Sequence, residues 1–209
     1  MYIPKYFQVT DPDEIWDFVE KNGFGTIVTA KQGRPIATHV PLQVRREGEA
    51  CYITGHLAYG NPQWRSLDAC EDVLVMFQGP HAYISSSWYK QENVPTWNYQ
   101  AVHLYGTSRI LEAEELKQDI SRLLQKYEGH RPNPVLSERL SPEFFEKQLK
   151  GIVGFQIQVQ EVQAAYKLSQ NRNAEDYLNI VNKLHQEQDL NSQEMAQAME
   201  RKRKANNEG

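Results

Sequence analysis

Residues 25–57, GTIVTAKQGRPIATHVPLQVRREGEACYITGHL, contain three short segments that are rich in β-branched residues and separated by turn signals. Gly33 divides the first segment from the second, and Glu47-Gly48-Glu49 divides the second from the third. Glycine at these points allows the tight turns that close hairpins. A fourth segment of the same character, DVLVMFQG, occupies residues 72–79. The pattern therefore predicts four strands in an antiparallel meander.

Helical signals flank these strands. Asp11-Pro12, followed by apolar residues at helical spacing, predicts a short first helix that ends at Gly23. Asn61-Pro62 predicts a second helix with Asn61 as its cap, running to about Cys70 and crossing over beside the sheet. Residues 113–128 carry one apolar helical face, and Ser141-Pro142 begins another short helix.

Two further segments alternate as strands do, at residues 101–111 and 151–168. We therefore expect a mainly β fold with α-helices, of the α+β class. Its core would be a small closed or split β-barrel of about six mostly antiparallel strands with flanking helices. From residue 171 onward proline, Trp and Phe are absent, and two helical patterns follow, of which Asn191 and Glu194 resemble a capping box for the second. This predicts a domain at 1–170 and a helical appendage at 171–209.

Composition sets limits on the class of protein. The 209 residues are 40% hydrophobic and 24% charged, which suits one substantial core. The net charge of −4 gives no overall basic field, so contact with nucleic acid needs a local patch. The only cysteines are Cys51 and Cys70, and the start of the chain lacks a signal-peptide pattern, which favours a cytoplasmic protein with free thiols. No apolar run is long enough to span a membrane.

Several kinds of chemistry lack their sequence signatures. The six histidines form no His-x-x-x-His pair and there is no Cys-x-x-Cys, so we predict no metal site. Ser85-Ser86-Ser87 lacks the Gly-x-Ser-x-Gly elbow of serine hydrolases. Glycine-rich dinucleotide and phosphate loops are also absent. Any phosphate must therefore be held by another arrangement.

Two strand segments offer such an arrangement. Thr38 and His39 interrupt an apolar strand, and His56 ends the next strand shortly before Asn61. A helix amino terminus close to an imidazole can bind an anion such as a phosphate. The alternative is structural: His39 and His56 would be half-buried strand residues, and Asn61 would only cap a helix. The recurrence of the pattern on two successive strands favours a binding site.

Residues 78–106 are unusually aromatic for a segment broken by Gly79, Pro80 and Pro95. Trp88 and Trp97 therefore indicate the wall of a pocket for a flat ligand, although Trp is more often a core residue in a small barrel. A separate feature of the sequence is the cluster of basic residues Arg201-Lys202-Arg203-Lys204. A solvated helix end explains this run, and contact with DNA phosphates is the alternative.

The chain resembles the PaiB family of FMN-binding negative transcriptional regulators. The resemblance rests on blocks that follow one another from Met1 to about Arg172. These blocks are MYIPKYF, FGTIVT, IATHVPL, TGHLAYGNPQWR, VLVMFQGPHAYISSSWY, VPTWNYQAVHLYG, IVGFQIQV and YKLSQNR. The resemblance implies an FMN-binding split barrel, related to pyridoxamine-phosphate oxidases and flavin reductases, that works as a homodimer with flavin sites at the subunit interface.

The resemblance also implies roles for individual residues. Thr38, His39 and Val40 would lie beside the isoalloxazine ring, and His56, Asn61 and Arg65 would hold the FMN phosphate. The aromatic segment would wall the pocket or cross the dimer interface, and the segment KLSQN would close it. The residues expected in these two roles are Tyr83, Trp88, Trp97 and Asn98, followed by Lys167, Ser169, Gln170 and Asn171.

Two functions follow from the resemblance. The first is a repressor of genes for sporulation and for protease synthesis. The second is an FMN-dependent oxidoreductase related to flavin reductases and pyridoxamine-phosphate oxidases, or a haem-handling relative, in which His39 and Tyr83 are the first residues to test. The sequence contains no evident helix-turn-helix motif. Direct DNA contact would therefore fall to Arg201, Lys202, Arg203 and Lys204, repeated across a dimer.

Overall fold

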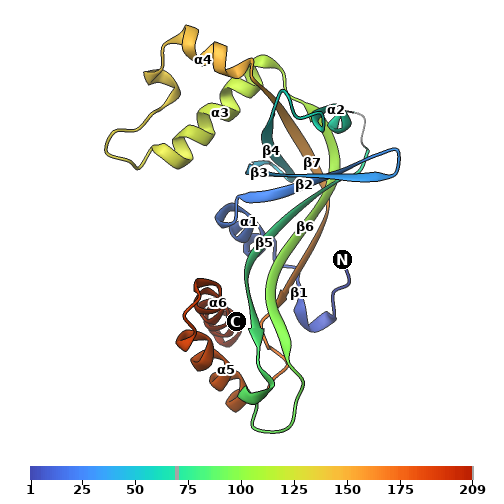
Figure 1. Ribbon diagram of the computed structural model, residues 1–209, viewed down its shortest axis with the longest axis vertical. Helices are drawn as coiled ribbons and strands as arrows, with labels where there is room; N and C mark the ends of the chain where they lie inside the picture. Colours follow the sequence, from blue (N-terminus) through green and yellow to red (C-terminus); the bar gives the residue numbers. More distant parts are fainter. Residues whose placement is uncertain (69–70, 209) are drawn as a thin grey trace. The chain divides into compact units, whose positions relative to one another are not determined.

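The computed structural model describes residues 1–68 and 71–208 (Figure 1). Cys70, one of the two predicted free thiols, lies outside the described residues, whereas Cys51 is a free cysteine. Among the described residues, no helix combines the length and the apolar character that crossing a membrane requires. Within the same ranges, no group of three or more His, Cys, Asp or Glu side chains is placed to hold a metal ion.

In the described residues, seven strands form one sheet whose two ends meet. The strands are β1 (Gln8–Val9), β2 (Phe24–Lys31), β3 (Arg34–Glu47), β4 (Ala50–Ala58), β5 (Val73–Ile84), β6 (Thr96–Ile110) and β7 (Ile152–Lys167). Their order is β1-β7-β4-β3-β2-β5-β6, and an additional pairing of β7 with β6 closes a barrel of six strands. The predicted mainly β barrel is confirmed, with the two-residue β1 as an added strand.

Helices connect and flank these strands. The α-helices are α1 (Pro12–Lys21), α2 (Trp64–Leu67), α3 (Ala113–Glu128), α4 (Pro142–Leu149), α5 (Ala174–Gln186) and α6 (Leu190–Glu208). Three short 3-10 turns, η1 (Lys5–Phe7), η2 (Ser86–Trp88) and η3 (Ser137–Arg139), complete the described elements. Asp11 Oδ1 accepts a hydrogen bond of 2.9 Å from the Asp13 amide at the start of α1, and Ser141 caps α4, as their sequences predict.

The predicted meander is correct for β2, β3 and β4 and wrong for β5. β5 pairs with β2, in the register Ile27↔Val75, and does not pair with β4. The chain therefore crosses over from β4 to the far side of β2 through the segment that contains α2. Because β2 and β3 have β4 on one side and β5 on the other, neither is an edge strand.

Two predicted helix starts shift. α2 begins at Trp64, not beside Asn61, because Asn61 Oδ1 accepts from the Gln63 amide, at 3.0 Å, in a turn that precedes the helix. α6 begins at Leu190, since Asp189 Oδ1 accepts from the Ser192 amide at 2.9 Å, so Asn191 is not its cap. In both cases the side chain of an Asn or Asp, Asn61 or Asp189, accepts a hydrogen bond from a backbone amide two or three residues further along the chain.

The aromatic segment is also more regular than predicted. β5 continues through Gly79 and Pro80 to Ile84, and β6 begins at Thr96, directly after Pro95. The prolines therefore do not divide the segment into turns. The two strands flank a connection, residues 85–95, that contains η2.

The chain divides into two compact units. One unit contains residues 19–77 and 104–162, and its interior is formed by fully buried residues that include Ile27, Leu42, Ile53, Phe77, Leu104, Phe155 and Ile157. The other unit contains residues 1–18, 78–103 and 163–209, and in it α5 and α6 pack together through Tyr177, Ile180, Leu184, Met195 and Met199. We call them the barrel unit and the terminal unit. The predicted division at residue 170 stays a prediction.

Candidate functional site

Strand β3 presents the predicted ring-binding residues on two opposite faces. Thr38 pairs with Ile27, which is completely buried, so Thr38 points towards the barrel interior. His39 pairs with Thr26 and points outward, and Val40 is again an interior residue. The side chain of His39 is therefore accessible on the outer face of this strand, whereas Thr38 and Val40 point inward, and their predicted contacts with a flavin stay a prediction.

A buried glutamine organises the inner end of this part of the barrel. Gln63 is fully buried, and its side-chain amide donates to Ile36 O at 3.0 Å and to Thr29 Oγ1 at 3.3 Å. Its Oε1 accepts a hydrogen bond from Thr38, and Asn61 Nδ2 donates to Thr38 Oγ1 at 3.1 Å. The structure therefore brings Thr38 and Asn61 together, and Gln63 joins them. Their polar atoms already have partners inside the protein.

The outer face of β2 and β3 carries an exposed aromatic pair. Phe24 is 67% exposed, and its ring centroid lies 6.4 Å from that of His39 with an interplanar angle of 22°. On a solvent-facing strand, a large exposed aromatic surface is typical of a binding site. This pair provides a flat surface of two nearly parallel rings.

His56 lies on the face of β4 that is directed towards α3. Thr54, two residues earlier and so on the same face, donates from Oγ1 to Asp119 Oδ1 at 2.6 Å. Burial lowers the pKa of His56, and the charge of Asp119 opposes that shift. Among the described residues, His56 Nδ1 is buried without a hydrogen-bond partner. His56 is therefore a neutral imidazole with one ring nitrogen still to be satisfied.

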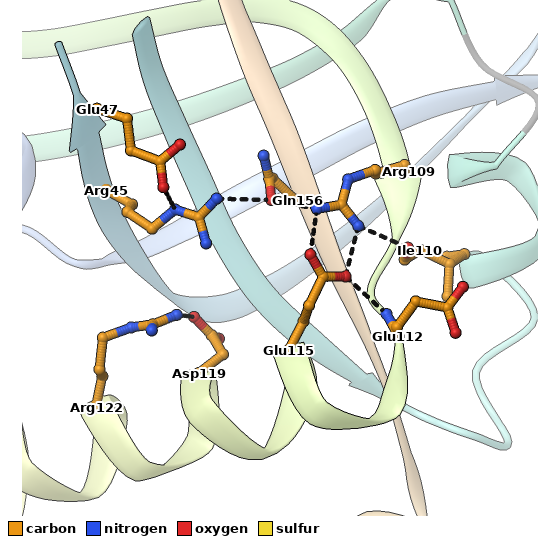
Figure 2. Close-up of polar contacts among 9 residues, drawn as sticks. All are labelled: Arg45, Glu47, Arg109, Ile110, Glu112, Glu115, Asp119, Arg122 and Gln156. Carbon is orange, nitrogen blue, oxygen red and sulfur yellow. Dashed lines mark hydrogen bonds and ion pairs between the residues drawn. The ribbon is translucent and has the colours of Figure 1, made fainter.

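Asp119 is a residue that the sequence reasoning missed. Its side chain is 1% exposed, and besides Thr54 it accepts from Arg122 Nη2 at 3.0 Å (Figure 2). The signal was present in the helical pattern, because position 119 lies on the same apolar face as Leu116 and Leu123. A carboxylate at such a position is buried when it has partners on the covered strand.

The same face continues as a network of ion pairs and hydrogen bonds across four elements, β3, β6, α3 and β7. Arg109 forms a two-pronged ion pair with Glu115, at 2.6 and 2.7 Å, and donates to Gln156 Oε1 at 2.9 Å (Figure 2). Arg45 also reaches Gln156, at 3.3 Å. The hydrogen bonds from Arg109 and from the Glu112 amide lower the pKa of Glu115 to about 2. This network attaches α3 to β6 and β7, so the face beneath it is covered and unavailable to a ligand.

Arg65 is the remaining predicted phosphate ligand in the barrel unit. Its side chain is exposed, and its guanidinium carbon lies 4.5 Å from the centroid of the Trp64 ring. Trp64 is itself held by a hydrogen bond of 3.0 Å from Nε1 to Tyr59 O. Within the described ranges Arg65 has no carboxylate partner, so it is available to an anion.

The other predicted residues lie in the terminal unit. Tyr83 and Trp97 are 48% and 55% exposed and meet edge to face, with centroids 5.9 Å apart. With Trp88 they line a cavity of about 390 Å³. Glu187 and Asp189 line the same cavity, and the predicted role of these aromatic residues at a flavin stays a prediction.

Asn98, Lys167 and Gln170 make internal contacts in the same unit. Asn98 is fully buried, and its Nδ2 donates to Ser169 Oγ at 2.9 Å. Lys167 donates to Thr96 Oγ1, and burial lowers the pKa of its ammonium group. Gln170 Oε1 accepts from the Leu168 amide at 2.7 Å. These residues shape the end of β7 and the chain that follows it.

The family comparison adds to this geometry. Residues 1–161 match the family model described as "Putative FMN-binding domain". The chain belongs to this family. The match confirms the predicted FMN cofactor, and it covers β1 to β6 and most of β7 but not residues 163–209 of the terminal unit.

Relatives extend the family assignment along the whole chain. The chain is 62% identical to the protease synthase and sporulation protein PAI 2 of Bacillus subtilis over 204 residues, which cover 98% of this chain and 99% of the relative. This confirms the predicted PaiB resemblance. A second relative, the uncharacterized protein YKL070W of Saccharomyces cerevisiae, is 29% identical over 158 residues, or 63% of this chain and 93% of its own.

Solved structures share the fold. The FAD and heme binding protein of Mycobacterium smegmatis superposes with a TM-score of 0.61 at 16% identity, covering 82% of this chain and 78% of that chain. The flavocytochrome Anf3 of Azotobacter vinelandii gives a TM-score of 0.60 at 14% identity, over 85% and 78% of the two chains. At these identities the likeness shows that this member of the FMN-binding family has their fold.

Proposed function

We propose that this protein is an FMN-binding transcriptional regulator that acts as a homodimer and affects genes of protease synthesis and sporulation. The observation that carries the flavin part is the exposed, nearly parallel pair of Phe24 and His39 on the outer face of β2 and β3. The regulatory part is supported by the 62% identity to PAI 2, whose name refers to protease synthesis and sporulation.

Three residues of the barrel unit offer groups that suit a flavin mononucleotide. Phe24 and His39 offer a flat surface for the ring system, and Arg65 is a guanidinium without a carboxylate partner among the described residues. Charge-assisted hydrogen bonds from a guanidinium to a phosphate are about twice as strong as neutral ones. We therefore assign the ring to Phe24 and His39 and the phosphate to Arg65. His56 Nδ1 also lacks a partner, but it is buried on the face of β4 that is directed towards α3, so we do not assign it to the flavin.

Thr38 and Asn61 would support this site without supplying its main contacts. Both side chains already bond to each other or to Gln63. Their role in the proposal is to fix the strand β3, on which His39 lies, and the turn that leads into α2, which carries Arg65. Rigid placement lowers the ordering cost of binding.

A second copy of the chain would cover the same outer face. Thr26, Val28, Leu74 and Met76 lie on it beside Phe24, and the four are only partly buried. Exposed apolar surface of this kind is typical of an interface. A homodimer would remove this surface from water and would enclose a flavin bound there.

FMN, when bound, supplies one-electron and two-electron redox chemistry. The chain's own contribution would be to bind the cofactor and exclude water from it. A flavin whose redox state alters the dimer would suit a regulator, and the oxidoreductase alternative stays a prediction in which His39 is the first residue to test.

The test is a titration of the purified full chain with FMN, in which quenching of flavin fluorescence measures the binding. We expect saturable binding, with the Kd raised about tenfold or more in Arg65→Gln, in line with the loss of a charged hydrogen bond. Arg139→Gln, which changes an exposed arginine elsewhere in the barrel unit, is the matched control. Analytical ultracentrifugation of the same samples reports the dimer.

The outcomes separate the parts of the proposal. If the wild-type chain does not bind FMN, the flavin proposal fails. Equal affinity in Arg65→Gln and wild type removes the phosphate assignment alone. A monomer at micromolar concentration, with FMN present, removes the dimer.

A further inference from the structure

A cavity of about 320 Å³ in the terminal unit is lined by three cationic side chains. They are Arg172, on the segment after β7, and Lys202 and Arg203, on α6. Leu168, Gln170, Ala174 and Tyr177 complete the lining. Arg65, Phe24 and His39 are not part of it, so the cavity is a different place from the proposed flavin face.

Aromatic rings fix both guanidinium groups at this cavity. The guanidinium carbon of Arg203 lies 4.7 Å from the centroid of the Tyr177 ring, and that of Arg172 lies 4.9 Å from the centroid of the Tyr89 ring. Tyr177 is in turn held by a hydrogen bond from its hydroxyl to Met199 O. Guanidinium groups stacked on rings keep their N–H edges available for carboxylate or phosphate oxygens.

Two of the three cationic side chains at this cavity have no carboxylate partner among the described residues. Lys202 has a carboxylate partner, since its Nζ lies 2.6 Å from Glu14. Two acidic residues of α5 and α6 are also engaged: Glu175 pairs with Lys90 at 2.9 Å, and Glu200 with His185 at 3.3 Å. In the part of the chain that the structure describes, neither Arg172 nor Arg203 forms an ion pair with a carboxylate.

Arg203 also has an unsatisfied atom. Its Nη1 is buried and has no hydrogen-bond partner among the described residues. A buried N–H of a charged group without a partner is costly, and such groups are normally satisfied by the protein, by water or by an ion. The amino terminus of α5, at Ala174, lies on the same cavity and contributes a positive helix dipole. The positive charges, the helix dipole and the unpaired N–H group therefore all favour a negatively charged ligand.

We propose that this cavity binds a small anion that carries a phosphate or a carboxylate group, held by the guanidinium groups of Arg172 and Arg203. The cavity volume is at the lower end of those found for small-molecule sites, which excludes a large ligand. Planar guanidinium groups suit both anions because each can donate two parallel hydrogen bonds. This site goes beyond the proposed FMN function and does not depend on it.

The experiment uses the full chain with FMN added, at fixed sodium chloride concentration. Inorganic phosphate and citrate are titrated separately by isothermal titration calorimetry. We expect at least one of them to bind, and Arg203→Gln to weaken that binding at least tenfold. Arg201→Gln is the matched control, because Arg201 is an exposed arginine of the same helix that does not line the cavity. The affinity of Arg203→Lys should lie between those of Arg203→Gln and Arg201→Gln, since lysine keeps the positive charge but cannot donate two parallel hydrogen bonds.

Each outcome bears on the site. Binding of phosphate alone or of citrate alone identifies the class of anion. Arg172→Gln should lose as much affinity for the anion as Arg203→Gln, and it replaces Arg203→Gln in the experiment if that variant does not fold. Absence of binding by either anion at millimolar concentration, or equal loss in Arg201→Gln, overturns the proposal. The proposal is also overturned if Arg203→Gln loses affinity for FMN and phosphate competes with FMN for binding. These two results together would make the cavity part of the flavin site.

Discussion

The ammonium group of Lys202 lies 2.6 Å from the carboxylate of Glu14, and this contact joins the last helix to the first. The two side chains are 23% and 30% exposed, so the pair is partly shielded from solvent. The contact links residues 188 positions apart in the sequence. Lys202 belongs to the basic run for which DNA contact is predicted, and that contact stays a prediction.

We expect Glu14→Gln to lower the free energy of unfolding by about 1 kcal/mol, because a partly buried pair is worth somewhat more than an exposed one. Urea denaturation of Glu14→Gln, Lys202→Gln and the double variant gives the coupling energy. A coupling energy of zero in this cycle would show that the pair does not stabilise the fold.

DNA contact by the basic run can now be tested without disturbing α6. Lys202 and Arg203 make contacts inside the terminal unit, whereas Arg201 and Lys204 are exposed. We expect Arg201→Gln/Lys204→Gln to weaken retardation of DNA in a gel shift at about 50 mM salt, by roughly three- to tenfold, through lost phosphate contacts. Truncation after Glu200 would also remove the pair with Glu14.

The matched control for this test is Lys147→Gln/Lys150→Gln, which removes the same charge from the barrel unit. Retardation that is equal in both double variants would show that the effect is one of net charge only. Retardation that stays at the wild-type level in Arg201→Gln/Lys204→Gln would exclude this run as the DNA contact.

Asp119 supports the attachment of α3 to β4. Because its carboxylate is buried and bonded to Thr54 and Arg122, we expect Asp119→Ala to lower the free energy of unfolding by about 3 kcal/mol. Thr54→Val should cost less, roughly 1 to 2 kcal/mol. Urea denaturation followed by circular dichroism measures both, with Gln118→Ala, at an exposed position of the same helix, as control. Similar stability of Asp119→Ala and Gln118→Ala would contradict the assignment.

Most elements of the fold could be predicted because their signals are local. The strands at 25–57, the helix at 113–128 and the cap at Ser141 are specified by residues within a few positions of each other. The position of β5 beside β2 could not be predicted this way, since a crossover is decided by pairing across the barrel. The blocks of sequence identified the family because they extend along the whole barrel.

The candidate site was only partly predictable for a related reason. Thr38 and His39 were expected to act together, yet neighbouring residues of a strand point to opposite faces, so one is internal. Phe24 became a candidate only when the register placed it beside His39. Gln63 depends on partners that are distant in the sequence, and Asp119 depends on distant Thr54 as well as on nearby Arg122, so local sequence gives no sign of Thr54 or of the partners of Gln63.

Gly106 tests the closure of the barrel by β6 and β7. A Cβ at this position would lie 1.9 Å from the carbonyl oxygen of Gln158, so any side chain forces the two strands apart. We expect Gly106→Ala to lower the free energy of unfolding by about 3 kcal/mol, at the upper end of the cost of overpacking. Gly60→Ala is the control, because no atom lies within 4 Å of its added Cβ. Equal thermal stability of the two variants would mean that the strands are not in close contact there.

His56 should make stability depend on pH between about 7.5 and 5.5. Burial lowers its pKa in the folded state below the ordinary value of 6.5. At a pH between the lowered value and 6.5, the unfolded chain therefore binds more protons than the folded chain. Stability then rises with pH, is complete above 6.5 and is lost as the pH falls. At pH 5.5 the loss is at most about 1.4 kcal/mol, the equivalent of one pKa unit.

The measurement is the free energy of unfolding in urea at pH 7.5, 6.5 and 5.5. We expect His56→Gln to reduce the loss of stability between the first and last of these values. Burial also lowers the pKa of His103, so His103→Gln should act in the same direction, whereas His130→Gln changes an exposed imidazole and serves as the control. Glu115, with its pKa of about 2, stays ionised over this range and does not contribute. A pH dependence that is the same in His56→Gln and the wild type would show that His56 is not held neutral by burial.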